Sequence, residues 1–101
     1  MTTDSDDLLG ARLRLPQHVV HRSFVAETVV LNLKTGKYHG LNPMAGRMLD
    51  IVEEAPSVRE AAEVIAKEYD QDLASVEADL VTFCRQLLDR ELVEVVVVDP
   101  S

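Results

Sequence analysis

From residue 37 to residue 43 the chain reads Lys37-Tyr38-His39-Gly40-Leu41-Asn42-Pro43, directly after the turn Lys34-Thr35-Gly36. A glycine at the end of a three-residue hairpin loop tolerates the positive φ that such turns need. Asn42 and Pro43 are typical of a helix start, because asparagine caps the first turn and proline fits the first helical position. This stretch therefore predicts the second arm of a β-hairpin, Lys37 to Leu41, that runs directly into a helix.

Two further strands are predicted before this arm. Residues 28–33 alternate, with Val29, Leu31 and Leu33 on one face of the strand. Residues 12–23 carry short apolar patches interrupted by Pro16. Proline lacks the donor that a central strand needs, so this segment predicts an edge strand or a bulge. Together with the arm at residues 37–41, these segments predict a three-stranded antiparallel sheet.

Three helices are predicted after the sheet. Asn42 caps the first helix, and its apolar stripe consists of Met44, Met48, Ile51, Val52 and Ala55. Ser57 and Glu60 have the spacing of a capping box and begin the second helix. Asp72 is placed to cap a third and longer helix that extends to about Arg90.

The last apolar segment, Leu92–Val98, is rich in β-branched residues and predicts a C-terminal strand. A sheet, then three helices, then a strand is the order of a winged-helix-like α+β fold. We expect residues 1–10 to form a flexible, polar N-terminus and residues 11–98 to form one domain. The C-terminal strand could pair within the domain as a wing, across a homodimer, or with a partner enzyme, and the sequence leaves these alternatives open.

Composition excludes several classes of partner. The net charge is −8 and the ten basic residues are scattered, so nucleic acid is not an expected partner. No apolar stretch approaches the length of a membrane span, and the N-terminus lacks the pattern of a secretory signal. Cys84 is the single cysteine, so no intrachain disulfide can form. We therefore expect a cytoplasmic protein, with no membrane partner and no cofactor.

The third predicted helix has an apolar surface wider than a small sheet requires. At 100° per residue, Val76, Leu80, Phe83 and Leu87 form its core side. A flank of further apolar residues widens the surface to roughly 160°; it consists of Leu73, Val81, Cys84 and Leu88. The second helix, the terminal strand or a ligand could cover this flank. In the last case the flank and the strand at residues 37–41 would form two walls of a peptide groove.

Catalytic and metal-binding interpretations find little support. His18 and His21 lie three residues apart on a predicted strand, so they point to opposite faces and are poorly placed to share a metal ion. Cys84 lies on an apolar helical face, where a thiol is usually buried and inert. We therefore expect no metal site and no catalytic residue, and the protein is not expected to be an enzyme.

The hairpin and first helix, with Tyr38-His39-Gly40-Leu41-Asn42 after Thr35-Gly36 and ahead of three helices, resemble the PqqD-like family of peptide-recognition domains, also called RiPP recognition elements. Members bind the leader segment of ribosomally made precursor peptides. The resemblance covers about residues 29–93. It is looser in the third helix, and Glu91 stands where the family often has glycine.

The resemblance implies roles for particular residues. The peptide backbone would pair with Lys37, Tyr38, His39, Gly40 and Leu41. The side-chain pockets would be lined by Leu73, Leu80, Val81, Cys84 and Leu88, and Arg85 would meet an acidic leader residue. The implied partners are the precursor leader and a maturation enzyme. That enzyme is a leader peptidase in lasso-peptide systems, which overall resemblance slightly favours, and a radical or other modifying enzyme elsewhere.

Two rival functions remain at this stage. A winged-helix transcriptional regulator should present basic or amide side chains on its third helix. The solvent side here is mainly acidic and carries Glu77, Asp79, Gln86 and Asp89, with only Arg85 and Arg90 as basic residues. A structural subunit could instead dimerise through Leu92–Val98.

Overall fold

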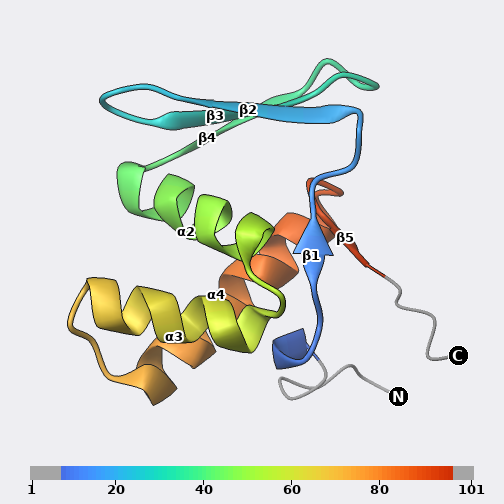
Figure 1. Cartoon of the computed structure of the whole chain (residues 1–101). Coiled ribbons are helices and arrows are strands. Elements are labelled where there is room, and N and C mark those ends of the chain that lie inside the picture. The colour runs from blue at the N-terminus through green and yellow to red at the C-terminus, as the bar shows by residue number, and fades with distance from the viewer. Residues whose placement is uncertain (1–7, 97–101) are drawn as a thin grey trace, which may run out of the picture.

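The computed structural model of this chain describes residues 8–96. Strands β2 (Val19–Ser23), β3 (Thr28–Asn32) and β4 (Tyr38–Leu41) form an antiparallel sheet in the order β2-β3-β4. This sheet lies over helix α2 (Pro43–Glu54), and helices α3 (Val58–Glu68) and α4 (Leu73–Asp89) lie below α2 (Figure 1). The predicted α+β order of a three-stranded sheet followed by three helices and a strand is confirmed.

The predicted helix starts are also confirmed. Asn42 Oδ1 accepts the Ala45 N–H at 2.7 Å, and Pro43 is the first residue of α2. Ser57 caps α3 and Asp72 caps α4 through bonds of the same kind. The apolar stripe of α2 is less regular than predicted, because Met44 is 45 % exposed while Gly46 and Leu49 are buried.

Residues 12–23 form two strands in separate sheets, where the sequence predicted one edge strand or bulge. Leu13–Arg14 is β1 and pairs antiparallel with β5 (Glu94–Val95), whereas β2 belongs to the three-stranded sheet. Pro16 lies between them, where the chain crosses from one sheet to the other (Figure 1). The C-terminal strand therefore pairs within the domain over its described part, and the predicted strand residues Val97 and Val98 lie outside the described residues.

The hydrophobic core begins earlier in the chain than the domain predicted from residue 11. Leu8 and Leu9 are both buried in the core cluster, although residues 1–10 were expected to be flexible. At the other end, Leu92 and Val93 are buried in the same cluster. These two residues of the predicted dimerisation segment are thus covered by their own chain.

Strand β3 turns its more polar face toward the helices. Thr28, Val30 and Asn32 are buried, whereas Val29 and Leu31 on the opposite face are only half-buried. Asn32 is satisfied because its side-chain oxygen accepts the backbone N–H groups of the following turn. The alternation predicted for this strand is confirmed, and its apolar face is the outer one.

The sheet approaches α2 closely at Gly46. A Cβ atom at Gly46 would lie 2.1 Å from Thr28 Oγ1 and 2.7 Å from Thr28 Cβ, well inside van der Waals contact. Thr28 is buried, and its hydroxyl lies 3.0 Å from the Ser23 hydroxyl on β2. Only glycine therefore lets the helix lie against the sheet at this point.

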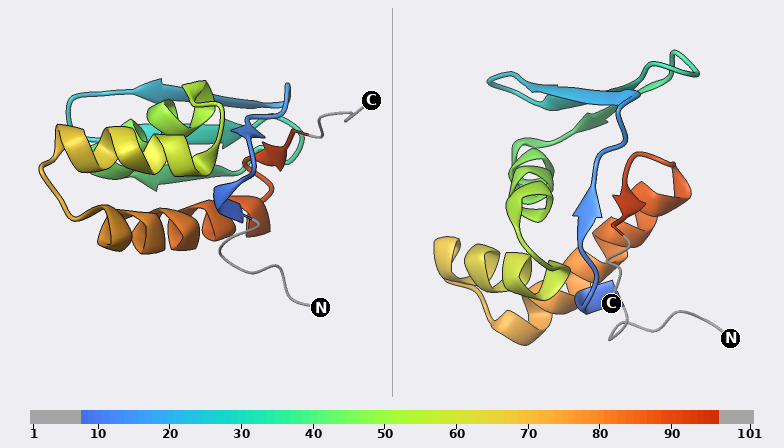
Figure 2. Two further views of the ribbon diagram at one scale, coloured as in Figure 1. Left: turned by 60° about the horizontal axis from the view of Figure 1, so that its bottom comes forward. Right: turned by 45° about the vertical axis from the view of Figure 1, so that its right-hand side comes forward.

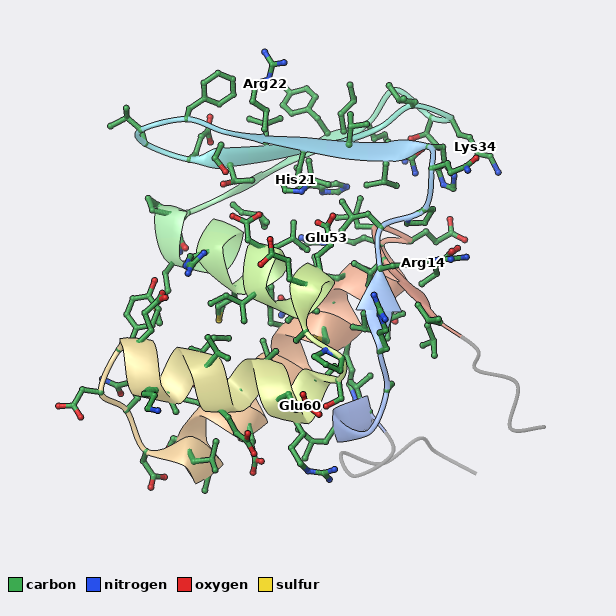
Figure 3. All side chains as sticks on the ribbon, in the orientation of Figure 1. Arg14, His21, Arg22, Lys34, Glu53 and Glu60 are labelled. Atoms are coloured by element: carbon green, nitrogen blue, oxygen red, sulfur yellow. The ribbon has the colours of Figure 1, made fainter. Side chains whose placement is uncertain are left out.

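A second link between the sheet and α2 comes from His21. Its side chain points from β2 toward α2 (Figure 3), where its Nε2 atom lies 3.1 Å from a carboxylate oxygen of Glu53. The Nδ1 atom lies 3.7 Å from Asp50, which is too long for a hydrogen bond. The ring is thus held over α2 between two carboxylates.

Helix α4 ends in a Schellman motif at Glu91, the position where the PqqD-like family that the sequence resembles often has glycine. Glu91 has a φ of 57°, and the Leu92 N–H donates to the Leu87 carbonyl at 2.9 Å. Leu87 and Leu92 are both buried, so the motif has its usual hydrophobic contact. The left-handed conformation explains why glycine suits this position, and glutamate adopts it here.

Replacing Gly46 with alanine is expected to destabilise the fold by about 1–2 kcal/mol, because the new methyl group must displace Thr28. On an open helix face the same change would stabilise the folded protein by about 0.5–1 kcal/mol. The sign of the change in unfolding free energy therefore shows whether Thr28 lies against Gly46. Urea denaturation of both proteins measures it. The penalty should shrink in a Thr28→Ala background, and a gain in stability for Gly46→Ala would contradict the close approach.

Candidate functional site

Strand β4 is an open edge of the sheet within residues 8–96, because its described pairing is with β3 alone. The Asn32 N–H donates to the Lys37 carbonyl at 2.9 Å, which makes these two residues a hydrogen-bonded pair. Such pairs alternate along an antiparallel ladder, so the backbone groups of His39 also point toward β3. Those of Tyr38 and Gly40 point away from β3, toward the open edge.

The side chains of β4 alternate between the face of the sheet that covers the helices and the opposite, outer face. His39 and Leu41 face the helices, and Leu41 is buried. Tyr38 faces outward with its side chain 72 % exposed, and Gly40 lies on the same outer face. A strand added at this edge could therefore pair with the backbone N–H and C=O groups of Tyr38 and Gly40. Its own side chains would alternate between the inner and the outer face of the sheet.

A cleft separates the β4 side of the sheet from the C-terminal end of α4. Figure 2 (left) shows β4 on the side of the sheet nearest α4 and β2 on the far side. One cavity of about 270 Å³ lies between the β4 side of the sheet and the end of α4. Lys37 and His39 line its strand wall, and Asp89, Arg90 and Glu91 line its helix wall. A second cavity of about 310 Å³ borders the same helix end and includes Leu88 and Lys34.

The structure brings only part of the predicted site together. Lys37 and His39 line the first cavity, and half-buried Leu88 lines the second. Leu73 lies at the other end of α4, beside Val64 of α3. Arg85 is exposed on α4.

The remaining predicted pocket residues belong to the core. Leu80 and Cys84 are fully buried and Val81 is 4 % exposed. They share one core cluster with the buried face of α3, which packs along α4. The chain itself thus covers this part of the flank, and a peptide would reach these three side chains only after a rearrangement.

Sequence reasoning missed the residues at the end of α4. Asp89, Arg90 and Glu91 form the helix wall of the cleft opposite Lys37. Their polar character made them look like an ordinary solvated helix end. The available signal was position 91, where the family often has glycine. Glycine is common at the left-handed residue that ends a helix, and this turn lies at the helix wall of the cleft.

Cys84 has the properties of a structural thiol. Burial raises its pKa to about 12, so the nucleophilic thiolate is scarce at neutral pH. Residues 8–96 contain no group of three or more His, Cys, Asp and Glu side chains suited to hold a metal ion. In the same range, no helix combines the length and apolar character that crossing a bilayer requires.

These features define a class of binding domain. A winged-helix-like α+β fold leaves one sheet edge open beside a cleft walled by a helix, which is the arrangement in which extended peptides are bound by strand addition. The family model described as coenzyme PQQ synthesis protein D (PqqD) matches residues 27–93. The chain therefore belongs to the PqqD family.

Solved structures agree with this assignment. The chain is 35 % identical to TbiB1, solved in complex with the TbiA(beta) leader peptide; the match covers 85 % of this chain and 99 % of that one, with a TM-score of 0.74. A lasso peptide synthetase B1 complexed with the leader peptide is 20 % identical over 83 % of this chain and 99 % of its own, with a TM-score of 0.74. Comparison with curated protein sequences gives no match.

The third similar structure is the PqqD truncation of PqqCD from Methylobacterium extorquens, a stand-alone RiPP recognition element. It is 24 % identical and has a TM-score of 0.71, and the match covers 92 % of this chain and 95 % of that one. At this identity, as at 20 %, the likeness shows the fold.

Native Cys84 is expected to resist alkylation by iodoacetamide at pH 7.5, because its thiol is buried and its pKa is raised. Intact-mass spectrometry should show labelling at least about 100-fold slower than for a matched variant, Cys84→Ala with Thr82→Cys, which places the thiol on the exposed side of the same helix. Equal rates would contradict the core assignment and show that this flank opens.

Proposed function

We propose that this protein binds the leader segment of a ribosomally synthesised precursor peptide by strand addition to β4 and delivers it to a maturation enzyme. The observation that carries the proposal is the outward-pointing backbone groups of Tyr38 and Gly40, which have no partner strand within residues 8–96 and lie beside the cleft at the end of α4. The likeness to TbiB1, which was solved with a leader peptide, supports it.

The leader would be recognised at two levels. Its backbone would bond to the N–H and C=O groups of Tyr38 and Gly40, which demands little of the leader sequence. Alternate side chains would enter the cleft, where Lys37 on the strand wall faces Asp89 and Glu91 on the helix wall. Arg90 also lines the helix wall, so this wall has one net negative charge opposite the cation of Lys37. This difference between the walls would favour one direction for a leader that carries both charges, and Leu88 adds an apolar contact in the adjoining cavity.

The role proposed here is recognition without catalysis. The buried Cys84 thiol is unsuited to act as a nucleophile, and the cleft is a trough between a strand edge and a helix end. The chemistry would come from the partner, a leader peptidase in a lasso-peptide system or a radical or other modifying enzyme. One of the similar solved structures is a lasso peptide synthetase B1, which supports the lasso alternative.

DNA binding has less support as the function of this winged-helix-like fold. Glu77, Asp79 and Asp89 lie on the solvent side of α4, and the whole chain has a net charge of −8. A helix with this face would be repelled by the phosphate backbone rather than held in the major groove.

Tyr38→Pro is expected to weaken leader binding at least about tenfold, because proline removes the edge donor and its ring blocks the approaching strand. The N–H at this position points away from β3, so the ladder within the sheet keeps its bonds. Fluorescence polarisation with a labelled leader from a precursor encoded beside this protein measures the affinity.

The matched control is Tyr38→Ala, which keeps the edge N–H and removes the outward side chain. Its leader affinity should stay within about threefold of the unmodified protein. Equal binding by Tyr38→Pro and Tyr38→Ala, with both variants folded by circular dichroism, would show that the leader does not pair with β4.

A further inference from the structure

The two cavities at the end of α4 adjoin beneath the β3–β4 turn. They share three lining residues, Asn32, Thr35 and Glu91. From these residues the cavity of about 270 Å³ extends to His39 on β4, and the cavity of about 310 Å³ extends to His18, next to β2. We call the two cavities together the turn trough. It begins beside the open edge of β4 and continues past the end of that strand.

Asn32 lies where the two cavities meet, and half of its side-chain amide is unused. The residue is only 7 % exposed. Its Oδ1 atom accepts the Lys34 N–H at 2.9 Å and the Thr35 N–H at 3.3 Å. Two backbone donors that converge on one atom identify it as the amide oxygen, so the other terminal atom is the amino nitrogen. Within residues 8–96 this amino group donates no hydrogen bond.

The turn alone does not account for the amino group of Asn32. It uses only the side-chain oxygen, and aspartate would supply the same acceptor. A polar group in a largely buried side chain normally has a partner, because an unpaired one costs stability. Since Asn32 lines both cavities, its amino group is accessible to a ligand in the turn trough. An amino group of this kind only donates, so the matching ligand atom is an oxygen acceptor.

A leader paired with β4 would pass directly beside the turn trough. The Asn32 N–H donates to the Lys37 carbonyl, so these two residues lie opposite each other at the end of the β3–β4 ladder. A leader strand paired with Tyr38 and Gly40 would run along β4 toward this end. Past Lys37 the chain turns back toward β3, so the leader would have no further strand edge to pair with. The turn trough is the space next to it at this point.

We propose that the leader segment that continues past the Lys37 end of β4 enters the turn trough, where the Asn32 amino group donates a hydrogen bond to one of its oxygen atoms. The inference rests on the proposed leader-binding function and adds a second point of recognition to it. Charged residues of both signs line the trough, so hydrogen-bond chemistry, and not net charge, defines the matching group. A backbone carbonyl and a side-chain oxygen both have this chemistry.

The test replaces the amino group and keeps the oxygen that the turn uses. Asn32→Asp should weaken leader binding at least about tenfold by fluorescence polarisation, because the donor is lost and two acceptors would face each other. Gln17→Glu is the matched control, since it makes the same amide-to-carboxylate change at an exposed residue between Pro16 and His18 that lines neither cavity. Its leader affinity should stay within about threefold. Equal losses for both variants would show an effect of added charge and overturn the inference.

A double-mutant cycle identifies the acceptor on the leader. If the acceptor is a side-chain oxygen, alanine at one leader residue beyond the paired strand should cost about tenfold with the unmodified protein and little with Asn32→Asp. If it is a backbone carbonyl, the same coupling should appear for an amide-to-ester replacement at one position, because an ester carbonyl is a weaker acceptor. Absence of coupling in both scans would contradict the proposed hydrogen bond.

A second measurement uses the unmodified protein and does not depend on how a variant folds. In NMR spectra, leader binding should shift the side-chain amino signals of Asn32 and slow their hydrogen exchange at least about threefold. The amino group of Gln71, which donates to the Tyr69 carbonyl near the other end of α4, should not change. Protection of the Tyr38 and Gly40 amides with no change at Asn32 would overturn this inference and leave leader binding intact. Failure of the unmodified protein to bind any leader would overturn both.

Discussion

The close approach of α2 to the sheet at Gly46 is the constraint on which the rest of this structure depends. Without a Cβ at that position, Thr28 and β3 lie directly against the helix, and His21 reaches Glu53 from the neighbouring strand. The sheet is thus supported by α2 and not by α4. This leaves β4 open on the α4 side, forms the cleft at the helix end, and leaves the face of the sheet opposite the helices uncovered by residues 8–96.

The parts of the fold that could be predicted from the sequence are those with local causes. The hairpin turn at Gly36, which has a φ of 75°, and the caps at Asn42, Ser57 and Asp72 each depend on side chains within a few residues. The pairing of β1 with β5 joins segments about 80 residues apart, so no local pattern indicates it. The same limit applies to the site: a helical wheel shows that Leu80 and Cys84 are apolar, but only the packing of α3 shows that they are covered.

Strand β4 carries the proposed recognition mainly through its backbone. The backbone groups of Tyr38 face the open edge, where pairing with a leader would need little sequence similarity, and its side chain faces away from the helices. Backbone pairing of this kind would let one small domain bind leaders of variable sequence. Under this proposal the polar cleft residues Lys37, Asp89 and Glu91 would set which leaders fit.

Amide hydrogen exchange measured by NMR with and without the leader peptide tests leader capture at β4 most directly. In the free protein the amides of Tyr38 and Gly40 should exchange fast and that of His39 slowly, because only the last points toward β3. Leader binding should slow Tyr38 and Gly40 at least about tenfold and leave His21, at the opposite edge of the sheet, unchanged. Saturable binding with no added protection at Tyr38 and Gly40 would contradict strand addition to β4.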